Sequence, residues 1–317
     1  MRWGFLGASR IGRRALAPAV LEAGHTLHAV AARDIGRARE FADAFGAADA
    51  YGDYFEMLRD PAIDAIYNAL PNDQHLSMTI AAMDAGKHVL CEKPLALDAE
   101  EVEGMQQGER MFARVVMEAF CHIHHPQLAR VQDRLRSGAI GRLLSMQMSF
   151  GNTLEDAGDF RWHAAMGGGA LFDLGCYCVS LMRVLAGEPR SVSAVQVLRG
   201  EVDESFSGQL DFGGIVGQFT CSFAAARTQH LEIIGSNGKL LLDWPISTKG
   251  RETMLFVNGE AERFAAIDPY VRMVRHFARM AGSEPAIEYG LDWSLAQAQA
   301  MDALFAAARG GRVVAVG

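Results

Sequence analysis

The apolar run His88–Cys91 leads directly into Glu92, Lys93 and Pro94. A short run of this kind is typical of a buried β-strand, and open α/β sheets bind their ligands at the carboxyl ends of strands. A lysine at that point can supply positive charge to a developing alkoxide, and the proline after it restricts the backbone. One lysine alone proves little, so its meaning depends on the motifs around it.

A glycine-rich turn stands near the start of the chain. The segment Gly7–Gly12 follows one predicted strand and opens a helix, with the spacing of a dinucleotide-binding turn. Ser9 takes the middle position, where a glycine normally lets the backbone approach a pyrophosphate. A serine is small enough to stand there, and its hydroxyl can donate to a phosphate. Such a pattern also fits a plain turn, but its place at the first strand–helix junction favours a dinucleotide.

The end of the second predicted strand selects between the two nicotinamide dinucleotides. An NAD site usually has an acid there for the ribose hydroxyls, whereas this chain has Ala32, followed by Arg33 and, one helical turn later, Arg37. Two guanidinium groups suit a ribose 2′-phosphate, so we predict NADP, with NAD as the alternative. Two other interpretations remain open: solvated arginines with Asp34 as helix N-cap, or Asp34 as a displaced ribose-binding acid.

A second polar pair follows the glycine cluster 167–169. Asp173 and Tyr177 are four residues apart and share one face of a predicted helix. The apolar stripe of that helix is formed by Leu171, Leu174, Cys178, Leu181 and Leu185. An acid and a phenol together suit a polar pocket. Taken alone, the pair fits equally well a surface aspartate and a half-buried tyrosine.

These residues suit hydride transfer between a nicotinamide and an alcohol or carbonyl. The developing alkoxide needs a positive donor, which Lys93 can provide, and its proton needs an acceptor. A phenol has a pKa of about 10, so Tyr177 would be a poor base unless a neighbouring ammonium favours its phenolate. Asp173 would orient one of these groups or the substrate hydroxyl. The hypothesis therefore assigns catalysis to Lys93, Tyr177 and Asp173.

Composition excludes several classes of function. The formal charge of −8 and the lack of a basic cluster argue against nucleic-acid or anionic-membrane partners, and no apolar run reaches the roughly 18 residues of a membrane span. The five cysteines include no Cys-x-x-Cys motif, which predicts a reducing, cytoplasmic compartment. His122, His124 and His125 lack a completing ligand set, so we predict no metal and a pocket or packing role for them.

The pattern of elements changes near residue 120. Before it, short apolar runs alternate with amphipathic helices, which predicts a doubly wound parallel sheet. After it, period-two alternation over 215–223 and a hairpin at Ser236-Asn237-Gly238 predict a largely antiparallel sheet with helices on one face. Aromatic residues on the other face would be buried against a partner subunit or within the chain's own core. The expected α/β domains are 1–120 and 121–317, with the C-terminal helix able to pack back on the first.

Four ordered motifs together resemble a known family. Gly7–Gly12, Pro71–His75, Glu92–Pro94 and Gly167–Tyr177 are similar to the successive signatures of the Gfo/Idh/MocA oxidoreductases, which include glucose–fructose oxidoreductase and inositol dehydrogenase. The resemblance covers essentially the whole chain. Its Ala-Ala-Arg-Asp strand end and Asp-x-Gly-x-Tyr motif are most similar to dimeric dihydrodiol dehydrogenases and NADP-dependent D-xylose dehydrogenases.

The resemblance implies a Rossmann domain and an open-faced α/β domain whose sheet often forms a dimer interface, hence a homodimer or higher homo-oligomer. It also implies that Lys93 is catalytic beside the nicotinamide, often before a cis proline. The loop with Asn72 and His75 would approach the nicotinamide ribose. The cofactor-binding residues we expect are Gly7, Ser9, Arg10, Ile11, Arg33, Arg37, Leu70, Pro71, Asn72, His75, Glu92, Lys93, Arg161 and Trp162.

The sequence therefore predicts an NADP-dependent oxidoreductase acting on a sugar, polyol or diol. Two alternatives remain. The first is a glycoside hydrolase, because some relatives of the family use a tightly held NAD to cleave glycosides. The second is a non-catalytic nucleotide-sensing protein. Arg33 and Arg37 favour an exchangeable NADP, and the set of Lys93, Asp173 and Tyr177 has no purpose in a sensor.

Overall fold

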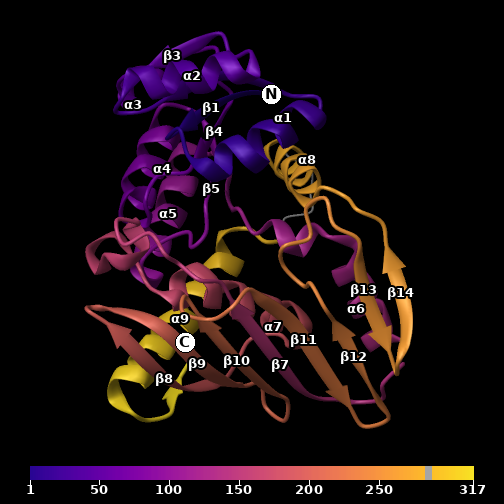
Figure 1. The fold of residues 1–317 in the computed structure, drawn as a ribbon. Coiled ribbons are helices and arrows are strands. Elements are labelled where there is room, and N and C mark those ends of the chain that lie inside the picture. Colours follow the sequence, from indigo (N-terminus) through magenta and orange to yellow (C-terminus); the bar gives the residue numbers. More distant parts are fainter. Residues whose placement is uncertain (283–287) are drawn as a thin grey trace. The chain divides into compact units, whose positions relative to one another are not determined.

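The alternating pattern of the N-terminal segment forms a six-stranded parallel sheet in this computed structural model, which describes residues 1–282 and 288–317 (Figure 1). The strand order is β3-β2-β1-β4-β5-β6. The four strands that lie between the two edge strands are almost wholly buried, as expected when helices cover both faces of a sheet. The strands are β1 Arg2–Leu6, β2 Thr26–Ala31, β3 Asp49–Tyr51, β4 Ala65–Asn68, β5 His88–Cys91 and β6 Val116–Glu118.

Short acidic side chains begin three of the helices in this part of the chain. The carboxylates of Asp34, Asp53 and Asp98 accept hydrogen bonds from backbone N–H groups in the following turns, and Gly46 ends its helix in the left-handed conformation at φ 68°. The helical elements are η1 Gly12–Leu16, α1 Ala17–Glu22, α2 Ile35–Phe45, α3 Tyr54–Leu58, η2 Asn72–Gln74, α4 His75–Asp84, α5 Ala99–Phe112 and α8 Pro269–Ala281.

The chain forms two compact units, and the first is discontinuous in sequence. Residues 1–121 and 270–295 make up the first unit, and residues 122–269 and 296–317 the second. The core of the first unit joins the two segments, because the rings of Trp3 and Phe277 are fully buried with centroids 5.1 Å apart. The ranges 1–120 and 121–317 predicted from the sequence have a single boundary and do not include this return of the chain.

The second unit is built on a nine-stranded, mostly antiparallel sheet, as predicted. Its order is β14-β13-β12-β11-β7-β10-β9-β8-β15, and β7 and β10 run parallel. The predicted hairpin is present, with Gly235 opposite Gly238 across the turn. The strands are β7 Leu143–Gly151, β8 Ser191–Arg199, β9 Val202–Asp211, β10 Val216–Ser222, β11 Thr228–Gly235, β12 Gly238–Leu242, β13 Thr253–Val257, β14 Glu260–Phe264 and β15 Val314–Ala315.

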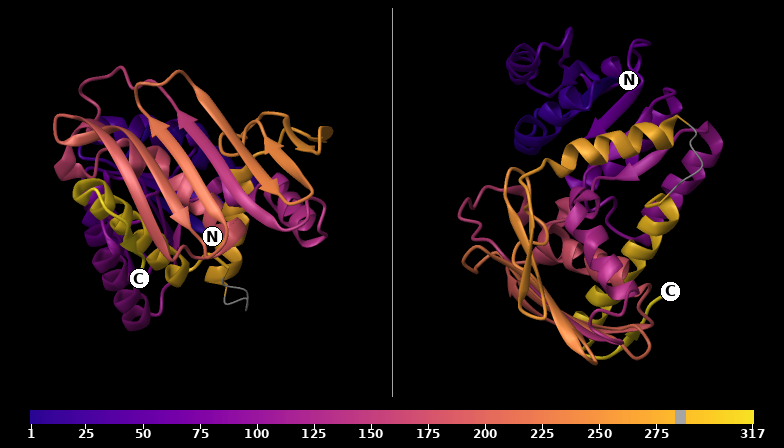
Figure 2. Two further views of the ribbon diagram at one scale, coloured as in Figure 1. Left: turned by 90° about the horizontal axis from the view of Figure 1, so that it is seen from below. Right: turned by 90° about the vertical axis from the view of Figure 1, so that its right-hand side faces the viewer.

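Helices cover one face of this sheet and leave the other bare (Figure 2). Phe206 of β9 packs against Phe219 of β10 and Phe305 of α9, so the alternating aromatic residues lie in the chain's own core. Of the two interpretations left open by the sequence, burial against a partner is therefore wrong for these rings. The helical elements are η3 Cys121–His124, α6 Pro126–Arg136, η4 Phe160–Trp162, η5 Ala164–Met166, η6 Leu171–Gly175, α7 Cys176–Ala186 and α9 Leu291–Gly310.

One helical stretch of the described chain, 164–186, is long and apolar enough to cross a membrane by length and composition, because it contains an 18-residue window with a mean hydropathy of 1.4. Asp173 and Arg183 interrupt this stretch, so the sequence shows no uninterrupted apolar run across it. About two thirds (67%) of that window is buried within the protein. Core helices of globular proteins have the same property, so the stretch is weak evidence for a membrane span.

Candidate active site

The glycine turn after β1 has the backbone that its sequence demands. Gly7 has φ 90°, and a Cβ there would lie 3.3 Å from the carbonyl oxygen of Ala69. The hydroxyl of Ser9 accepts a hydrogen bond from the backbone N–H of Gly12 at 3.0 Å. A hydroxyl keeps its own proton when it accepts, so Ser9 can still donate to a phosphate. The tight turn, the Ser9 hydroxyl and the helix N-terminus therefore fit the pyrophosphate of a dinucleotide.

The two arginines after β2 have different surroundings. Arg37 donates from its guanidinium to the carbonyl oxygen of Ala8 at 3.1 Å, which joins helix α2 to the glycine turn. Arg33 is exposed. The Asp34 carboxylate accepts from the N–H groups of Gly36 and Arg37, so it serves as the N-cap that the sequence offered as one interpretation. An acid used in this way is poorly placed to bind a ribose.

Two acids, the partly buried Glu92 and the buried Glu118, fix the loop that carries Lys93. Glu92 accepts a hydrogen bond from the hydroxyl of the fully buried Tyr67 at 2.5 Å, and burial together with this carboxylate raises the pKa of Tyr67 well above its usual value. Glu118, 3% exposed, accepts from the backbone N–H of Leu95 at 2.9 Å. The peptide bond between Lys93 and its proline is cis, as the resemblance implies. Lys93 therefore stands between two anchored positions.

His75 ties this loop to the neighbouring one. Its ring is fully buried, with Nδ1 2.8 Å from the carbonyl oxygen of Pro94 and Nε2 2.9 Å from that of Leu70. Burial lowers the pKa of His75 against the opposing effect of these carbonyls. No side-chain atom of His75 is open to a ligand, so its connection to the cofactor would act through the loops that it joins. Asn72 lies at the start of η2 with 7% exposure.

The predicted cofactor-binding residues of the first unit thus surround the carboxyl ends of β1, β2, β4 and β5. These four strands are neighbours in the sheet, and open parallel sheets bind dinucleotides at this edge. The residues placed there are Gly7, Ser9, Arg10, Ile11, Arg33, Arg37, Leu70, Pro71, Asn72, His75, Glu92 and Lys93.

In the second unit, Arg161 is held between two carboxylates. Its guanidinium lies 3.0 Å from Asp159 and 3.0 Å from Asp173. Burial disfavours its charge, but the two carboxylates outweigh burial and raise the pKa of Arg161. The sequence did not indicate that Arg161 pairs with Asp173. Trp162 packs edge-on against Phe223, with ring centroids 5.3 Å apart.

The glycine cluster before the helix allows two close approaches. A Cβ on Gly168 would lie 2.5 Å from the carbonyl oxygen of Arg161, and one on Gly169, at φ 118°, would lie 2.1 Å from a carboxylate oxygen of Asp203. That buried carboxylate accepts from the backbone N–H of Leu171 at 2.6 Å. Asp203 thus caps the helical segment that carries the predicted pair. Burial raises its pKa to about 6, against the lowering effect of the backbone hydrogen bonds.

Tyr177 lies at the start of α7, one turn after Asp173 in η6. Its ring packs edge-on against His122 and Phe150, with centroids 5.1 and 5.8 Å apart. The hydroxyl of Ser180 is 3.1 Å from Nε2 of His122 and donates to the carbonyl oxygen of Tyr177. The region of η6 is a π-helical turn, a feature that occurs often at functional sites.

The sequence alone did not indicate two residues that position the candidate site. Asp203 stands in a strand and gives no local sign of capping a distant helix. His122, for which the sequence predicts a pocket or packing role, packs against Tyr177. Glu118 had a usable signal, because an acid that ends a buried strand needs a hydrogen-bonding partner.

Comparison with known proteins agrees with this arrangement. Residues 1–120 match the model of the oxidoreductase family with an NAD-binding Rossmann fold, and residues 128–241 match that of the GFO/IDH/MocA C-terminal domain. The chain belongs to the Gfo/Idh/MocA oxidoreductase family. The resemblance inferred from the motifs is therefore confirmed.

Gfo/Idh/MocA relatives of the chain are named for sugar and diol chemistry. The chain is 32% identical to a D-xylose 1-dehydrogenase (NADP+) of Haloferax volcanii, over 99% of both chains. It is 34% identical to trans-1,2-dihydrobenzene-1,2-diol dehydrogenase of Mus musculus, over 83% of this chain and 80% of the relative. A 3-ketoreductase of Actinomadura kijaniata, solved with NADP and TDP-benzene, superposes with a TM-score of 0.92 at 30% identity, covering 97% of each chain.

The buried Asp203 predicts a pH dependence of stability. Its pKa is about 6 in the folded protein and about 4 in an unfolded chain, so the folded state binds the extra proton between these values. The free energy of unfolding should therefore fall as pH rises from 4 to 6, by at most about 3 kcal/mol from this group.

Urea unfolding of Asp203→Asn at several pH values tests this prediction. The asparagine keeps an oxygen acceptor, so the variant should fold and gain stability relative to the native chain as pH rises. Asp211→Asn, at the exposed far end of the same strand, is the matched control. A constant difference in unfolding free energy between Asp203→Asn and the native chain, from pH 4 to 7, would contradict the assignment.

Proposed function

We propose that the protein is an NADP-dependent oxidoreductase that transfers a hydride between the nicotinamide and a hydroxyl or carbonyl of a sugar, polyol or diol. The observation that supports it most directly is the anchoring of Lys93 at the ligand-binding edge of the sheet, between Glu92 on Tyr67 and Leu95 on Glu118. The names of the xylose and dihydrodiol dehydrogenases support the substrate class.

In the proposed reaction, bound NADP would supply the hydride acceptor, and the chain's residues would handle charge and proton. Lys93 would donate a hydrogen bond to the substrate oxygen and stabilise its developing negative charge. Tyr177 would accept the hydroxyl proton as phenolate. Asp173, held by Arg161, would accept a hydrogen bond from a further substrate hydroxyl. Reduction of a carbonyl would use the same groups in reverse.

Replacing the proposed catalytic residues should separate chemistry from cofactor binding. Lys93→Met should lower kcat by about 100- to 1000-fold through loss of one charged donor. Tyr177→Phe should lower it by about 100- to 10,000-fold. NADP affinity, measured by fluorescence titration, should change little in Tyr177→Phe, which lies outside the nucleotide-binding unit.

The assay is reduction of NADP at the nicotinamide absorbance with a panel of aldoses, inositols and diols. Lys239→Met, on an exposed hairpin lysine, is the control for loss of charge. Near-normal turnover in both catalytic variants would refute the proposed roles. Glycoside cleavage without net NADP reduction would favour the hydrolase alternative, and NADP binding with no turnover on any substrate would favour the sensor.

The preference for NADP over NAD is proposed to depend on Arg33, supported by its exposure after β2 and by the N-cap role of Asp34. Loss of one charged hydrogen bond to the 2′-phosphate should weaken NADP binding by about 10- to 100-fold in Arg33→Ala and leave NAD binding unchanged. Arg39→Ala, at an exposed position of the following helix α2, is the matched control. Equal loss for both nucleotides would contradict the proposal.

We also propose a homodimer formed through the bare face of the nine-stranded sheet. This face holds a groove of about 770 Å³, lined by serine, threonine and glutamine side chains together with apolar ones. Val195 and Val313 line it with 71% and 67% of their surfaces exposed, an arrangement that a second copy would cover. Burial of all five cysteines is consistent with the cytoplasmic location expected from the sequence.

Sedimentation equilibrium tests the proposed dimer. The native chain should have twice the monomer mass of 34.4 kDa. Val195→Glu should favour the monomer, because a two-fold axis would bury two copies of an unpaired carboxylate. Leu21→Glu, on a helix of the first unit, is the control and should stay dimeric. A native chain that sediments as a monomer would refute the dimer without affecting the proposed chemistry.

A further inference from the structure

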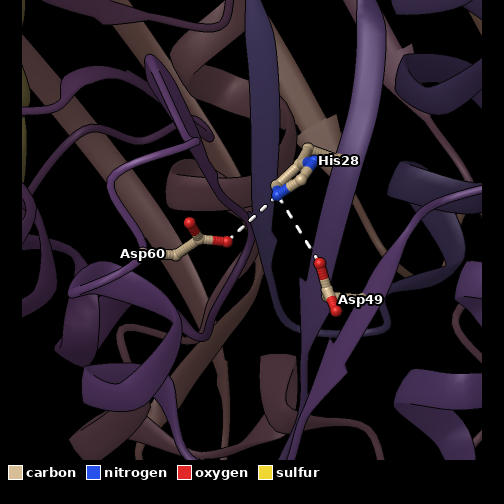
Figure 3. Close-up of side chains that lie close together, drawn as sticks. All are labelled: His28, Asp49 and Asp60. Atoms are coloured by element: carbon tan, nitrogen blue, oxygen red, sulfur yellow. Dashed lines mark hydrogen bonds and ion pairs between the residues drawn. The ribbon is translucent and has the colours of Figure 1, made fainter.

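Three potential metal ligands converge in the first unit, away from the candidate active site (Figure 3). His28 stands in β2, Asp49 begins β3, and Asp60 lies in the loop after α3. The Nε2 atom of His28 is 3.0 Å from a carboxylate oxygen of Asp60 and 3.6 Å from one of Asp49. All three donor atoms lie within 4.8 Å of one another.

These distances match the spacing of ligands around a small cation. In a tetrahedral zinc site with bonds of about 2.1 Å, donor atoms lie about 3.4 Å apart. The two distances from His28 fall on either side of that value. His28 and Asp60 are 18% and 12% exposed, whereas Asp49 is 51% exposed and has room to turn toward an ion. The exposed side also leaves space for a water ligand.

Hydrogen bonds hold the Asp60 carboxylate in position. One oxygen accepts from the backbone N–H of Ala62 at 2.8 Å, and the other accepts from the hydroxyl of Tyr51 at 3.2 Å. Partners of this kind orient metal-binding carboxylates and strengthen their binding. Such support is absent from a chance meeting of mobile surface acids.

Charge also favours a divalent ion at this position. Two carboxylates face one imidazole, so a protonated His28 compensates one of the two negative charges, whereas a divalent cation compensates both. Lys87 opposes this effect in part, because its ammonium donates to the carbonyl oxygens of Asp60 and Ile63 at 2.7 and 2.8 Å. That ammonium is directed at the backbone, so it does not itself bind either carboxylate.

We propose that His28, Asp49 and Asp60 bind one divalent transition-metal ion, with Zn²⁺ the best match for this nitrogen and oxygen set. The ion would join β2, β3 and the loop after α3, at the edge of the sheet where β3 has only three residues. Its role is structural, because these residues lie outside the groups proposed to bind NADP or substrate.

Isothermal titration of the full-length, EDTA-treated protein with ZnCl₂ in a non-chelating buffer tests the proposal. We expect one equivalent to bind to the native chain. His28→Gln and Asp49→Asn should each weaken binding at least tenfold, since each removes a ligand (about 1.4 kcal/mol per tenfold change). Asp49 is half exposed, so its variant should fold even if the His28 variant does not.

His163→Gln and Asp43→Asn, which change exposed residues elsewhere, are the matched controls and should bind like the native chain. Zinc should also raise the thermal midpoint of the native chain and not that of Asp49→Asn. Absence of stoichiometric binding, or full binding by Asp49→Asn, would overturn the proposal. If zinc were held elsewhere, for example by His122, His124 and His125, Asp49→Asn would bind it fully. NADP-dependent activity should be unaffected in both His28→Gln and Asp49→Asn.

Discussion

The buried imidazole of His75 sets the geometry on which the first unit's candidate site depends. It faces one carbonyl oxygen from each of two loops that leave neighbouring strands, at 2.8 and 2.9 Å. The neutral ring has one N–H, which can donate to one of these carbonyl oxygens, and losing that buried hydrogen bond would be costly in a low-dielectric interior. The loop before α4 and the loop of Lys93 are therefore held as one piece. Glu92 and Glu118 hold the second loop from either side.

The second unit uses carboxylates for a similar purpose. Asp203 reaches the start of the helix from a distant strand, and Gly169 has no side chain in its way. Asp159 and Asp173 clamp Arg161 from two sides. In both units, then, the residues proposed for chemistry are few, and a larger number of buried polar groups fix the backbone around them. This is the usual condition for a site whose donors must be in place before the substrate arrives.

Much of the fold could be predicted from the sequence because the signals were local. Continuous apolar strands, the aspartate N-caps and Gly46 each report on a few neighbouring residues, and the parallel sheet follows from their alternation. The three-residue strand β3 was missed because it is too short to show a period. The sequence allows the C-terminal helix to pack back on the first domain, but it does not indicate that α8 belongs to the first unit, because an amphipathic helix does not reveal which core it covers.

The residues of the candidate site likewise fall into those that local motifs indicate and those that only the folded structure reveals. Lys93, Gly7 and Arg33 stand in motifs whose spacing carries meaning, so the sequence could select them. Asp203, Glu118 and the pairing of Arg161 with Asp173 depend on residues that are far apart in sequence or lack a motif, and only the folded chain brings them together. His75 was selected by resemblance, and the structure gives a physical reason for it that no sequence pattern contains.

The discontinuity of the first unit has a consequence for biosynthesis. Trp3 is translated long before Phe277, the ring that packs on it, because most of this sequence lies between the two residues. During that interval the nascent sheet carries an uncovered aromatic surface, which chaperones bind and which promotes aggregation. The core of the nucleotide-binding unit therefore cannot close until residues 270–295 have been translated, after residues 122–269 of the second unit.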